Sequence, residues 1–325
     1  MLGNKSILII GGTGSLGNAL VDRYLGHCNQ ISIYSRGENA QWLMKTKYKV
    51  NSNLKFYVGD IRDRNRLQHC IFSCKPAIVI IAAALKHVDI CEQNVSECIN
   101  TNVNGVRNVV ELISEHAQTS TIPFLETVLF ISTDKACSPV NAYGMCKAIS
   151  ERIIIERSEL ILTPKMLVVR YGNVLSSNGS LLPKFKQMGE DPHIPDFTIT
   201  DPRMTRFFMT LTDSINLIEY AIVNGNRGET IIPAQIKSYK IKEITEWFST
   251  KYLKPIKITG IRQGEKIHES LISFTEGLRC VRRSDYFVVK PTWENVAIQE
   301  VAEFSSAMTS VFDPAIIEYL VDEKI

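Results

Sequence analysis

The sequence lacks the long apolar runs, the strong charge and the paired cysteines that mark several classes of protein. No apolar run approaches the ~20 residues that a membrane-spanning helix needs, so we expect no membrane partner. The formal net charge is only +3 in 325 residues, which is too small to predict a nucleic-acid partner. No Cys-x-x-Cys pair and no dense cysteine framework occurs, so we predict neither a metal site nor disulfides.

The eight cysteines are scattered along the chain, and most stand in apolar surroundings. We expect them to be small, reduced core residues of a cytoplasmic protein, since the first residues also run directly into an apolar strand without an export signal. Hydrophobic residues make up 45% of the chain and charged residues 22%. This composition predicts a globular protein with one large domain or two interleaved domains.

A glycine-rich loop follows the first apolar run. Ser6–Ile10 is predicted to be a strand buried on both faces, and Gly11-Gly-Thr-Gly-Ser-Leu-Gly17 then leads into a helix predicted over residues 18–25. Gly11 permits a tight turn, Gly14 lets the backbone approach a pyrophosphate, and Gly17 allows close packing of helix and strand. The free N–H groups at the helix start can hold phosphates. Strand, loop and helix in this order therefore predict a dinucleotide site.

Apolar strands continue to alternate with helices along the chain. We predict strands over residues 30–34, 54–60, 77–83, 128–131 and 165–171, an amphipathic helix over 209–223, and a last strand over 229–233. This alternation predicts an α/β fold, a Rossmann-type doubly wound parallel sheet with ligands at the carboxyl ends of its strands. We assign residues 1–172 plus 208–233 to the dinucleotide-binding domain. Residues 173–207 plus 234–325 are assigned to a smaller α+β substrate-binding domain, because residues 179–200 are rich in Pro, Gly and charge.

The end of the second strand indicates which dinucleotide binds. A carboxylate there would hold a ribose 2′-hydroxyl, but the sequence has Ser35 and Arg36. A hydroxyl and a guanidinium suit a 2′-phosphate, so we predict NADP, tightly bound and recycled; the alternative is that Arg36 is a surface arginine. Asp60, at the end of the third strand, is expected either to meet the adenine amino group or to cap a helix that starts at Arg62.

The expected cofactor contacts come from the glycine loop, from these strand ends and from the small residues after the fourth strand, where a flat ring can lie against backbone. A buried Asn102 is expected to organise that backbone. The predicted cofactor-binding residues are Gly11, Thr13, Gly14, Ser15, Leu16, Gly17, Ser35, Arg36, Asp60, Ile61, Ala82, Ala83, Ala84, Lys86, Asn102, Tyr143 and Lys147.

Acid and base side chains follow the fifth strand. Tyr143 and Lys147 stand at i and i+4 of a predicted helix and so share one face; the alternative is an ordinary solvated face. A cation at ~4 Å can lower a phenol pKa from ~10 toward 7, and we expect Lys147 to be that cation. Asp134 and Lys135 at the strand end add a second acid/base pair, which alcohol oxidation alone does not need.

These motifs together resemble the extended short-chain dehydrogenase/reductase superfamily. The loop Ser132-Thr-Asp-Lys135, with Ala84-Leu-Lys-His87, Arg170-Tyr-Gly-Asn173, Asp201-Pro-Arg-Met-Thr-Arg-Phe207 and Gly260-Ile-Arg-Gln-Gly-Glu-Lys-Ile-His-Glu269, resembles the UDP-N-acetylglucosamine 4,6-dehydratases that invert C5. The similarity extends to about residue 290. It implies a lyase that acts on a UDP-sugar for polysaccharide or 6-deoxy-aminosugar biosynthesis, and a homo-oligomer such as a hexamer.

The resemblance also implies the roles of five residues. Tyr143, assisted by Thr133 and Lys147, would take the proton from the sugar 4-hydroxyl. Lys135 would remove the C5 hydrogen as a neutral amine, so its pKa is expected to fall through desolvation or nearby cations such as Lys147. Asp134, protonated, would donate to the departing 6-hydroxyl. Retaining dehydratases typically carry Glu where this chain has Lys135, and a 4-epimerase would need neither Asp134 nor Lys135.

Charged and amide side chains in the second half are the candidates for holding the substrate. Arg206 and Arg262 are expected to clamp the diphosphate, because guanidinium groups suit phosphate oxygens; the alternative for each is a surface ion pair. Glu265 is expected to reach the nucleotide or to pair with Lys266. The predicted substrate-binding residues are Lys86, Thr133, Tyr143, Asn173, Arg206, Arg262 and Glu265.

Three functions remain open at this point. The first is a C5-inverting 4,6-dehydratase that yields a UDP-2-acetamido-2,6-dideoxy-L-arabino-hex-4-ulose. The second is a C5-retaining dehydratase or a nucleotide-sugar 4-epimerase. The third is an NADP-binding scaffold without catalysis, against which the filled acid/base positions argue.

Overall fold

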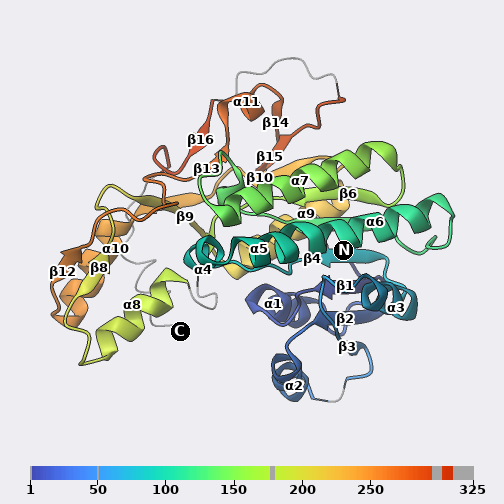
Figure 1. Cartoon of the computed structure of the whole chain (residues 1–325), viewed down its shortest axis with the longest axis horizontal. Coiled ribbons are helices and arrows are strands. Elements are labelled where there is room, and N and C mark those ends of the chain that lie inside the picture. Colours follow the sequence, from blue (N-terminus) through green and yellow to red (C-terminus); the bar gives the residue numbers. More distant parts are fainter. Residues whose placement is uncertain (1, 50, 176–179, 295–301, 310–325) are drawn as a thin grey trace.

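The computed structural model describes residues 2–49, 51–175, 180–294 and 302–309. Within these ranges a nine-stranded sheet has the order β14-β15-β10-β6-β5-β4-β1-β2-β3 (Figure 1). Pairing is parallel from β3 through β10 and antiparallel for β15 and β14. Its strands are β1 (Ser6–Ile10), β2 (Gln30–Ser35), β3 (Leu54–Val58), β4 (Ile78–Ile81), β5 (Thr127–Ile131), β6 (Lys165–Val169), β10 (Thr230–Pro233), β14 (Cys280–Arg283) and β15 (Tyr286–Val289). The predicted doubly wound parallel sheet is confirmed.

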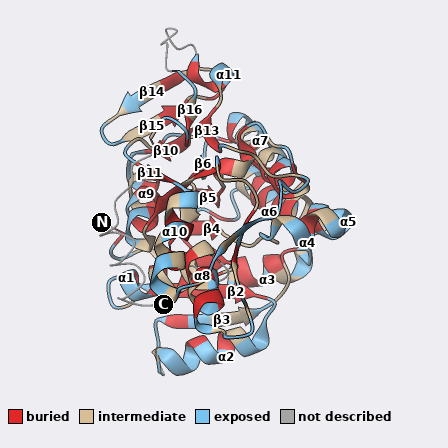
Figure 2. Cartoon of the chain, turned by 90° about the vertical axis from the view of Figure 1, so that its left-hand side faces the viewer, coloured by how far each residue is buried: buried red, intermediate tan, exposed pale blue. Residues whose placement is uncertain are grey.

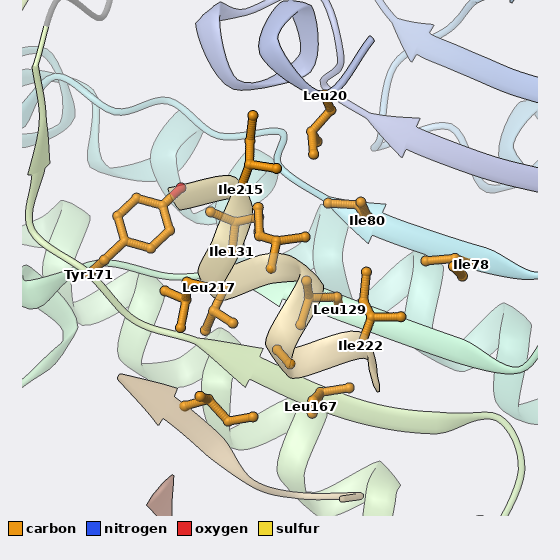
Figure 3. Packing of buried hydrophobic residues seen from close by; sticks show 14 of the residues in the cluster. Leu20, Ile78, Ile80, Leu129, Ile131, Leu167, Tyr171, Ile215, Leu217 and Ile222 are labelled. Carbon is orange, nitrogen blue, oxygen red and sulfur yellow. The ribbon is translucent and has the colours of Figure 1, made fainter. Parts of the chain in front are cut away.

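Helices cover both faces of this sheet, which explains why its strands are apolar throughout. Along β1, Ile7 and Ile9 enter one core while Leu8 and Ile10 enter the other. Figure 3 shows the first core, where Leu20 and Ile215 approach the sheet from two helices. The helices of that face are α1 (Ser15–Tyr24), α2 (Glu38–Lys47) and α9 (Leu211–Asn224), and those of the other face are α3 (Arg64–Cys74), α6 (Gly105–Gln118) and α7 (Ala142–Leu160).

A smaller lobe has its own aromatic core. Phe185, Phe197 and Phe248 pack with ring centroids 5.5–6.0 Å apart, and the lobe lies to the left in Figure 1. Its helices are α8 (Leu181–Glu190) and α10 (Ile241–Tyr252). The small sheets pair β7 (Asn173–Val174) with β9 (Thr205–Met209) and β11 (Lys237–Lys240), β8 (Phe197–Ile199) with β12 (Ile256–Ile258), and β13 (Ser270–Ile272) with β16 (Phe304–Ser305).

Short helices complete the described part of the chain. They are α4 (Val88–Gln93), α5 (Val95–Cys98), a π-helix (Ile99–Asn104), a 3-10 helix (Asp134–Ala136) and α11 (Phe274–Gly277). Figure 2 shows that the strands of the main sheet are largely buried, whereas α2 presents a mostly exposed surface. All eight cysteines are buried and free, as the sequence predicted. No helix in the described ranges is long and apolar enough to cross a membrane.

The start of one helix and the position of one strand in the sheet differ from the sequence predictions. Helix α1 begins at Ser15 rather than at residue 18, because the turn at Gly11 is complete within a few residues. The predicted last strand, β10, is not the edge of the sheet: β15 pairs with it and β14 pairs with β15. Both strands lie in the segment assigned to the substrate domain, and the division into two domains stays a prediction.

A buried glutamate holds this added hairpin. The Glu229 side chain, just before β10, is fully buried and accepts from Arg283 at 2.8 Å and from Lys290 at 2.8 Å. Burial alone would raise the pKa of Glu229, but the hydrogen bonds of Arg283 and Lys290 hold it at about 2. Two cations from the hairpin therefore compensate one buried carboxylate of the sheet.

A second buried network joins the end of β6 to α7 and α11. The Arg170 guanidinium donates to Glu151 of α7 at 3.0 Å and to both oxygens of Glu276 at 2.9 Å. Its two other donors reach the second oxygen of Glu151 at 2.5 Å and the carbonyl of Leu271 at 2.8 Å. All three charged residues are buried. Burial raises the pKa of Glu276, but Arg170 outweighs this effect and brings it to about 2; the network thus ties the C-terminal segment to the sheet edge that carries the site.

Replacing Glu276 tests how much this network stabilises the fold. Glu276→Gln leaves Arg170 with one carboxylate and is expected to lower the free energy of unfolding by ~3 kcal/mol at neutral pH. The pKa of Glu276 is depressed from 4.5 to about 2, so its contribution is complete above the unfolded value and is lost as pH falls toward 2. The difference between wild type and variant, measured by urea unfolding, should therefore shrink below about pH 4.

The exposed Lys242–Glu246 pair provides the matched control. Both side chains are more than half exposed, and Glu246→Gln should change stability by less than ~1 kcal/mol at any pH. Equal losses for the two variants at neutral pH would contradict the assigned importance of the buried network.

Candidate active site

A cleft of about 770 Å³ opens along the carboxyl ends of the parallel strands. Every predicted cofactor-binding residue except Asn102 lines it. Of the predicted catalytic residues, Thr133, Lys135, Tyr143 and Lys147 line it as well, and so does the predicted substrate residue Asn173. The sequence therefore identified most of the surface of this cleft, although the ligand contacts themselves stay predictions.

The glycine loop is shaped to receive an anion. Gly11 has φ +86°, and a Cβ there would lie 2.5 Å from the backbone of Ala83, so only glycine fits. Gly14 is the N-cap of α1 and makes no side-chain cap, and a Cβ there would meet only the carbonyl oxygen of Gly11, at 3.9 Å. No acidic residue occupies the first turn of α1. The uncapped N–H groups and the helix dipole thus favour a phosphate at this point.

The end of β2 faces the same cleft. The Ser35 hydroxyl accepts from the Gln41 amide at 3.0 Å, which leaves its own proton available to a ligand. The Arg36 side chain is 59% exposed and lies 4.0 Å from Asp60. Asp60 accepts from the guanidinium of Arg62 at 2.8 Å, and this pairing lowers the pKa of Asp60.

The expectation that Asp60 caps a helix starting at Arg62 is wrong. Helix α3 begins at Arg64, and its N-cap is Asp63, which accepts from the N–H of Arg66 at 2.9 Å. Asp60 instead accepts from the N–H of Arg62 in a tight turn. Two aspartates three positions apart present the same local signal, and only the backbone path decides which of them caps the helix.

Asn102 supports the backbone of a residue that lines the cleft. Its side-chain oxygen accepts from the N–H of Leu85 at 2.8 Å, and its nitrogen donates to the carbonyl of Leu85 at 2.8 Å. Asn102 lies in the π-helix and is buried. It fixes the backbone after Ala84, as the sequence predicted, but it does not line the cleft.

Thr133, Asp134 and Lys135 follow β5 and form one hydrogen-bonded unit. Asp134 is fully buried, and its Oδ1 accepts from the Thr133 hydroxyl at 2.9 Å and from the Lys135 amino group at 3.1 Å. The N–H of Asp134 donates to the carbonyl of Tyr171 at 2.9 Å, which anchors the unit to the chain after β6. The second oxygen of Asp134 is buried without a hydrogen-bond partner in the described chain.

The surroundings of Lys135 differ from the prediction. Its side chain is 19% exposed, and its amino group lies 3.7 Å from Glu269 as well as 3.1 Å from Asp134. Burial lowers the pKa of Lys135, but the two carboxylates outweigh burial and raise it overall. The cation that lowers the pKa of Lys135 is Arg206 and not the predicted Lys147. Its effect is smaller than that of either carboxylate.

Tyr143 is a buried residue that lines the cleft. Burial and then the negative charge of Asp134 raise its pKa, whereas a hydrogen bond with Thr133 lowers it. Lys147 donates to the carbonyl of Ile131 at 2.7 Å and lies over the ring of Phe130. Burial lowers the pKa of Lys147 to about 8, against the opposing charge of Glu151. The predicted lowering of the Tyr143 pKa by Lys147 is therefore absent from the protein alone, because the charge that dominates at the phenol is that of Asp134.

The predicted diphosphate clamps lie outside the described lining of the cleft. Arg206 donates to the carbonyls of Thr205 at 2.8 Å and Lys266 at 2.9 Å. The Arg262 side chain is 63% exposed and lies 3.3 Å from Glu265, which is the surface ion pair named as its alternative. Glu265 thus pairs with Arg262 and not with Lys266. The binding of a diphosphate by either arginine stays a prediction.

Three acidic residues that the sequence analysis did not select support the catalytic segment. Glu151 accepts from the hydroxyl of Ser132, a residue that lines the cleft. Glu92 accepts from the N–H of Ala142 at 2.6 Å, and Glu269 lies beside Lys135. A weak signal existed for Glu151, which continues the four-residue spacing of Tyr143 and Lys147 on a buried helix face.

Comparison with known proteins agrees with this geometry. A protein family described as "Polysaccharide biosynthesis protein" matches residues 7–291. The UDP-glucose 4-epimerase of Rickettsia bellii (strain OSU 85-389) is 37% identical over 297 residues, 88% of this chain and 83% of the relative. The UDP-N-acetylglucosamine 4,6-dehydratase (inverting) of Campylobacter jejuni (serotype O:23/36, strain 81-176) is 35% identical over 298 residues, 90% of this chain and 84% of the relative.

A solved structure covers the whole molecule. Pen from Bacillus thuringiensis superposes with a TM-score of 0.89 at 26% identity, and the match covers 100% of this chain and 99% of that one. The resemblance inferred from the sequence motifs is confirmed by these relatives. The chain belongs to the polysaccharide biosynthesis protein family of extended short-chain dehydrogenases/reductases.

Proposed function

We propose that the protein is a UDP-N-acetylglucosamine 4,6-dehydratase that inverts C5 and uses NADP. The inverting dehydratase of Campylobacter jejuni, which is similar over 90% of the chain, supports this function. The observation that carries it is the ion pair of the buried Asp134 with Lys135 after β5, with Lys135 and Tyr143 facing one cleft. Dehydration needs a base at C5 and an acid at O6 besides the group that acts at O4, and these side chains fill the three positions.

The cleft fits a nicotinamide dinucleotide. Gly14 and the start of α1 would hold the pyrophosphate, and Ser35 with Arg36 would hold a 2′-phosphate. When bound, NADP supplies reversible acceptance of a hydride, which oxidises C4 of the sugar and later reduces C6. The protein supplies the proton transfers around that exchange.

Transfer of one proton from Lys135 to Asp134 would bring Lys135, Asp134 and Tyr143 into the states that the reaction needs. Lys135 donates a hydrogen bond to Asp134 at 3.1 Å; transfer of this proton leaves a neutral amine and a neutral carboxylic acid. The amine is then the base for C5, and the acid can donate to the departing 6-hydroxyl. Loss of the Asp134 charge also removes a cause of the raised Tyr143 pKa, so that the phenol ionises more readily and can take the O4 proton.

Inversion at C5 requires that its new proton arrive on the face opposite to Lys135. Tyr143 carries the proton taken from O4 and faces the same cleft, which makes it the candidate donor. Thr133, which hydrogen-bonds to both Asp134 and Tyr143, keeps these two groups in a fixed relation.

Turnover of UDP-N-acetylglucosamine in deuterated water tests the proposal. The expected product, observed by NMR, is a 6-deoxy-4-keto sugar of L-arabino configuration with deuterium at C5. A D-xylo product would indicate retention and would overturn the inverting assignment. Absence of any product would overturn the dehydratase function itself.

A second candidate is a 4-epimerase of UDP-sugars, favoured by the similarity to the Rickettsia bellii UDP-glucose 4-epimerase over 88% of the chain. This reaction needs acid/base chemistry at O4 alone and gives Asp134 and Lys135 no role. A C4 epimer formed without loss of water, in the same NMR experiment, would establish it in place of the dehydratase.

Removal of the Lys135 amine should separate dehydration from cofactor binding. For Lys135→Ala we expect the rate of dehydration to fall by about 10²–10⁴-fold, while NADP stays bound, since the glycine loop is unchanged. Product formation and the absorbance of bound cofactor are measured on the same sample. Lys242→Ala, an exposed lysine of α10, is the control and should resemble wild type. Unchanged dehydration in Lys135→Ala would refute its role as the C5 base.

Arg36 should set the preference between the two dinucleotides. Arg36→Ala is expected to weaken binding of NADP by roughly tenfold or more, because a charge-assisted contact to the 2′-phosphate is lost, and to leave NAD binding nearly unchanged. Calorimetric titration of apoprotein with each dinucleotide measures both affinities. Arg107→Ala on the exposed side of α6 is the control, and equal weakening of NADP and NAD by Arg36→Ala would contradict the assignment.

A further inference from the structure

Residues 264–269 pack against the catalytic segment at three points. The carbonyl of Gly264 accepts from the Asn141 amide at 2.8 Å, from a residue 123 positions away. Lys266 donates to the carbonyl of Cys137 at 2.7 Å. Glu269 lies 3.7 Å from the amino group of Lys135. Residues 264–269 thus contact the chain between Lys135 and Asn141.

Glu269 is an unusual carboxylate. It is 3% exposed, and its Oε2 has no hydrogen-bond partner in the described chain. Lys135 and Arg206 lie 3.7 and 3.8 Å from Oε1, and Lys266 lies 3.7 Å from Oε2. These distances exceed those of ordinary hydrogen bonds. The three cations therefore attract the Glu269 carboxylate without donating a hydrogen bond to it.

The backbone of Glu269 is held firmly. Its N–H donates to the Ser306 hydroxyl at 2.9 Å, and its carbonyl accepts from the N–H of Ser306 at 2.7 Å. Of the three cations, Arg206 and Lys266 donate to backbone carbonyls, whereas Lys135 donates to the Asp134 side chain and is the one found in the described lining of the cleft. The backbone that carries the carboxylate is therefore fixed, and Lys135 is the partner placed to react.

We propose that Glu269 is a positioning residue for Lys135: it holds the amine beside Asp134 and stabilises the positive charge that the amine acquires when it takes the C5 proton. This inference rests on the proposed dehydratase function. In the step, the C5–H bond breaks, its electron pair moves toward the C4 ketone, and the proton forms a bond to the Lys135 nitrogen. A buried negative charge near that nitrogen, on a backbone that is already held in place, lowers the energy of the developing ammonium.

The charged groups around Lys135 determine whether substitution of Glu269 raises or lowers the pKa of Lys135. They are Asp134 from the 3-10 helix, Arg206 from β9, and Glu269 itself, with Lys266 on the far side of Glu269. The carboxylates raise the pKa of Lys135, so Glu269→Gln must lower it. A weaker base removes a proton more slowly once it is fully neutral, while it becomes neutral at a lower pH.

Competitive labelling of lysines with acetic anhydride tests the coupling without requiring catalysis. The full-length protein is labelled at a series of pH values, and modification of Lys135 is quantified by mass spectrometry of its peptide. In Glu269→Gln the labelling of Lys135 is expected to rise at lower pH than in wild type. Glu246→Gln, an exposed carboxylate of α10, is the control and should leave this profile in place. An unchanged Lys135 profile in Glu269→Gln would overturn the inference.

The second measurement is the pH dependence of turnover with UDP-N-acetylglucosamine. For Glu269→Gln we expect the rising limb of kcat to move to lower pH and its plateau to fall by about tenfold or more, with KM little changed. A lower kcat without a shift in the rising limb of its pH profile would indicate that Glu269 has a purely structural role. No turnover by wild type would overturn the proposed function, and the labelling result would still decide whether Glu269 acts on Lys135.

Glu269→Asp keeps the test decisive if the glutamine variant does not fold. The aspartate keeps the negative charge, but its side chain is shorter by one methylene, so the charge lies farther from Lys135. The Lys135 labelling profile should therefore shift to lower pH, by less than in Glu269→Gln. The plateau of kcat should lie between those of wild type and Glu269→Gln. Wild-type values for both measurements would count against a positioning role.

Discussion

The buried contact between Arg170 and the two carboxylates Glu151 and Glu276 is the interaction on which the arrangement of the site depends. Arg170 stands where β6 leaves the sheet, Glu151 lies on the helix that carries Tyr143, and Glu276 belongs to the C-terminal segment. A guanidinium presents several donors in a rigid plane, so it can hold two carboxylates from different elements at once. Removal of Arg170 would leave two buried carboxylates without compensation, which costs more stability than replacing all three residues by apolar ones.

Charges that are compensated by oppositely charged side chains, some of them distant in sequence, recur in the catalytic segment and at the added hairpin. Lys135 has Asp134 on one side and Glu269 on the other, while Glu229 is matched by Arg283 and Lys290 at the far edge of the sheet. Low dielectric strengthens each of these interactions. The charges around Lys135 therefore come from residue 269 as well as from the strand end itself.

Much of the fold and of the cleft was predictable because its determinants are local. Continuous apolar runs gave the strands, and the spacing of Gly11, Gly14 and Gly17 gave the loop at the start of α1. The antiparallel addition of β14 and β15 was not predicted, since short strands of mixed burial carry little periodicity. Arg206 and Arg262 were expected at the diphosphate from their charge alone, but the first donates to backbone carbonyls and the second pairs with Glu265.

The sequence by itself determined which residues stand at the carboxyl ends of the parallel strands, because strand, turn and helix are each specified by side chains within a few positions of one another. Tertiary structure alone decided the electrostatic state of those residues. The directions of the pKa shifts of Lys135 and Tyr143 were opposite to the expected ones, since an ionisable group responds to whichever charges and apolar atoms surround it in space. Some of those neighbours, such as Glu269 and Arg206 beside Lys135, come from parts of the chain that only folding brings together.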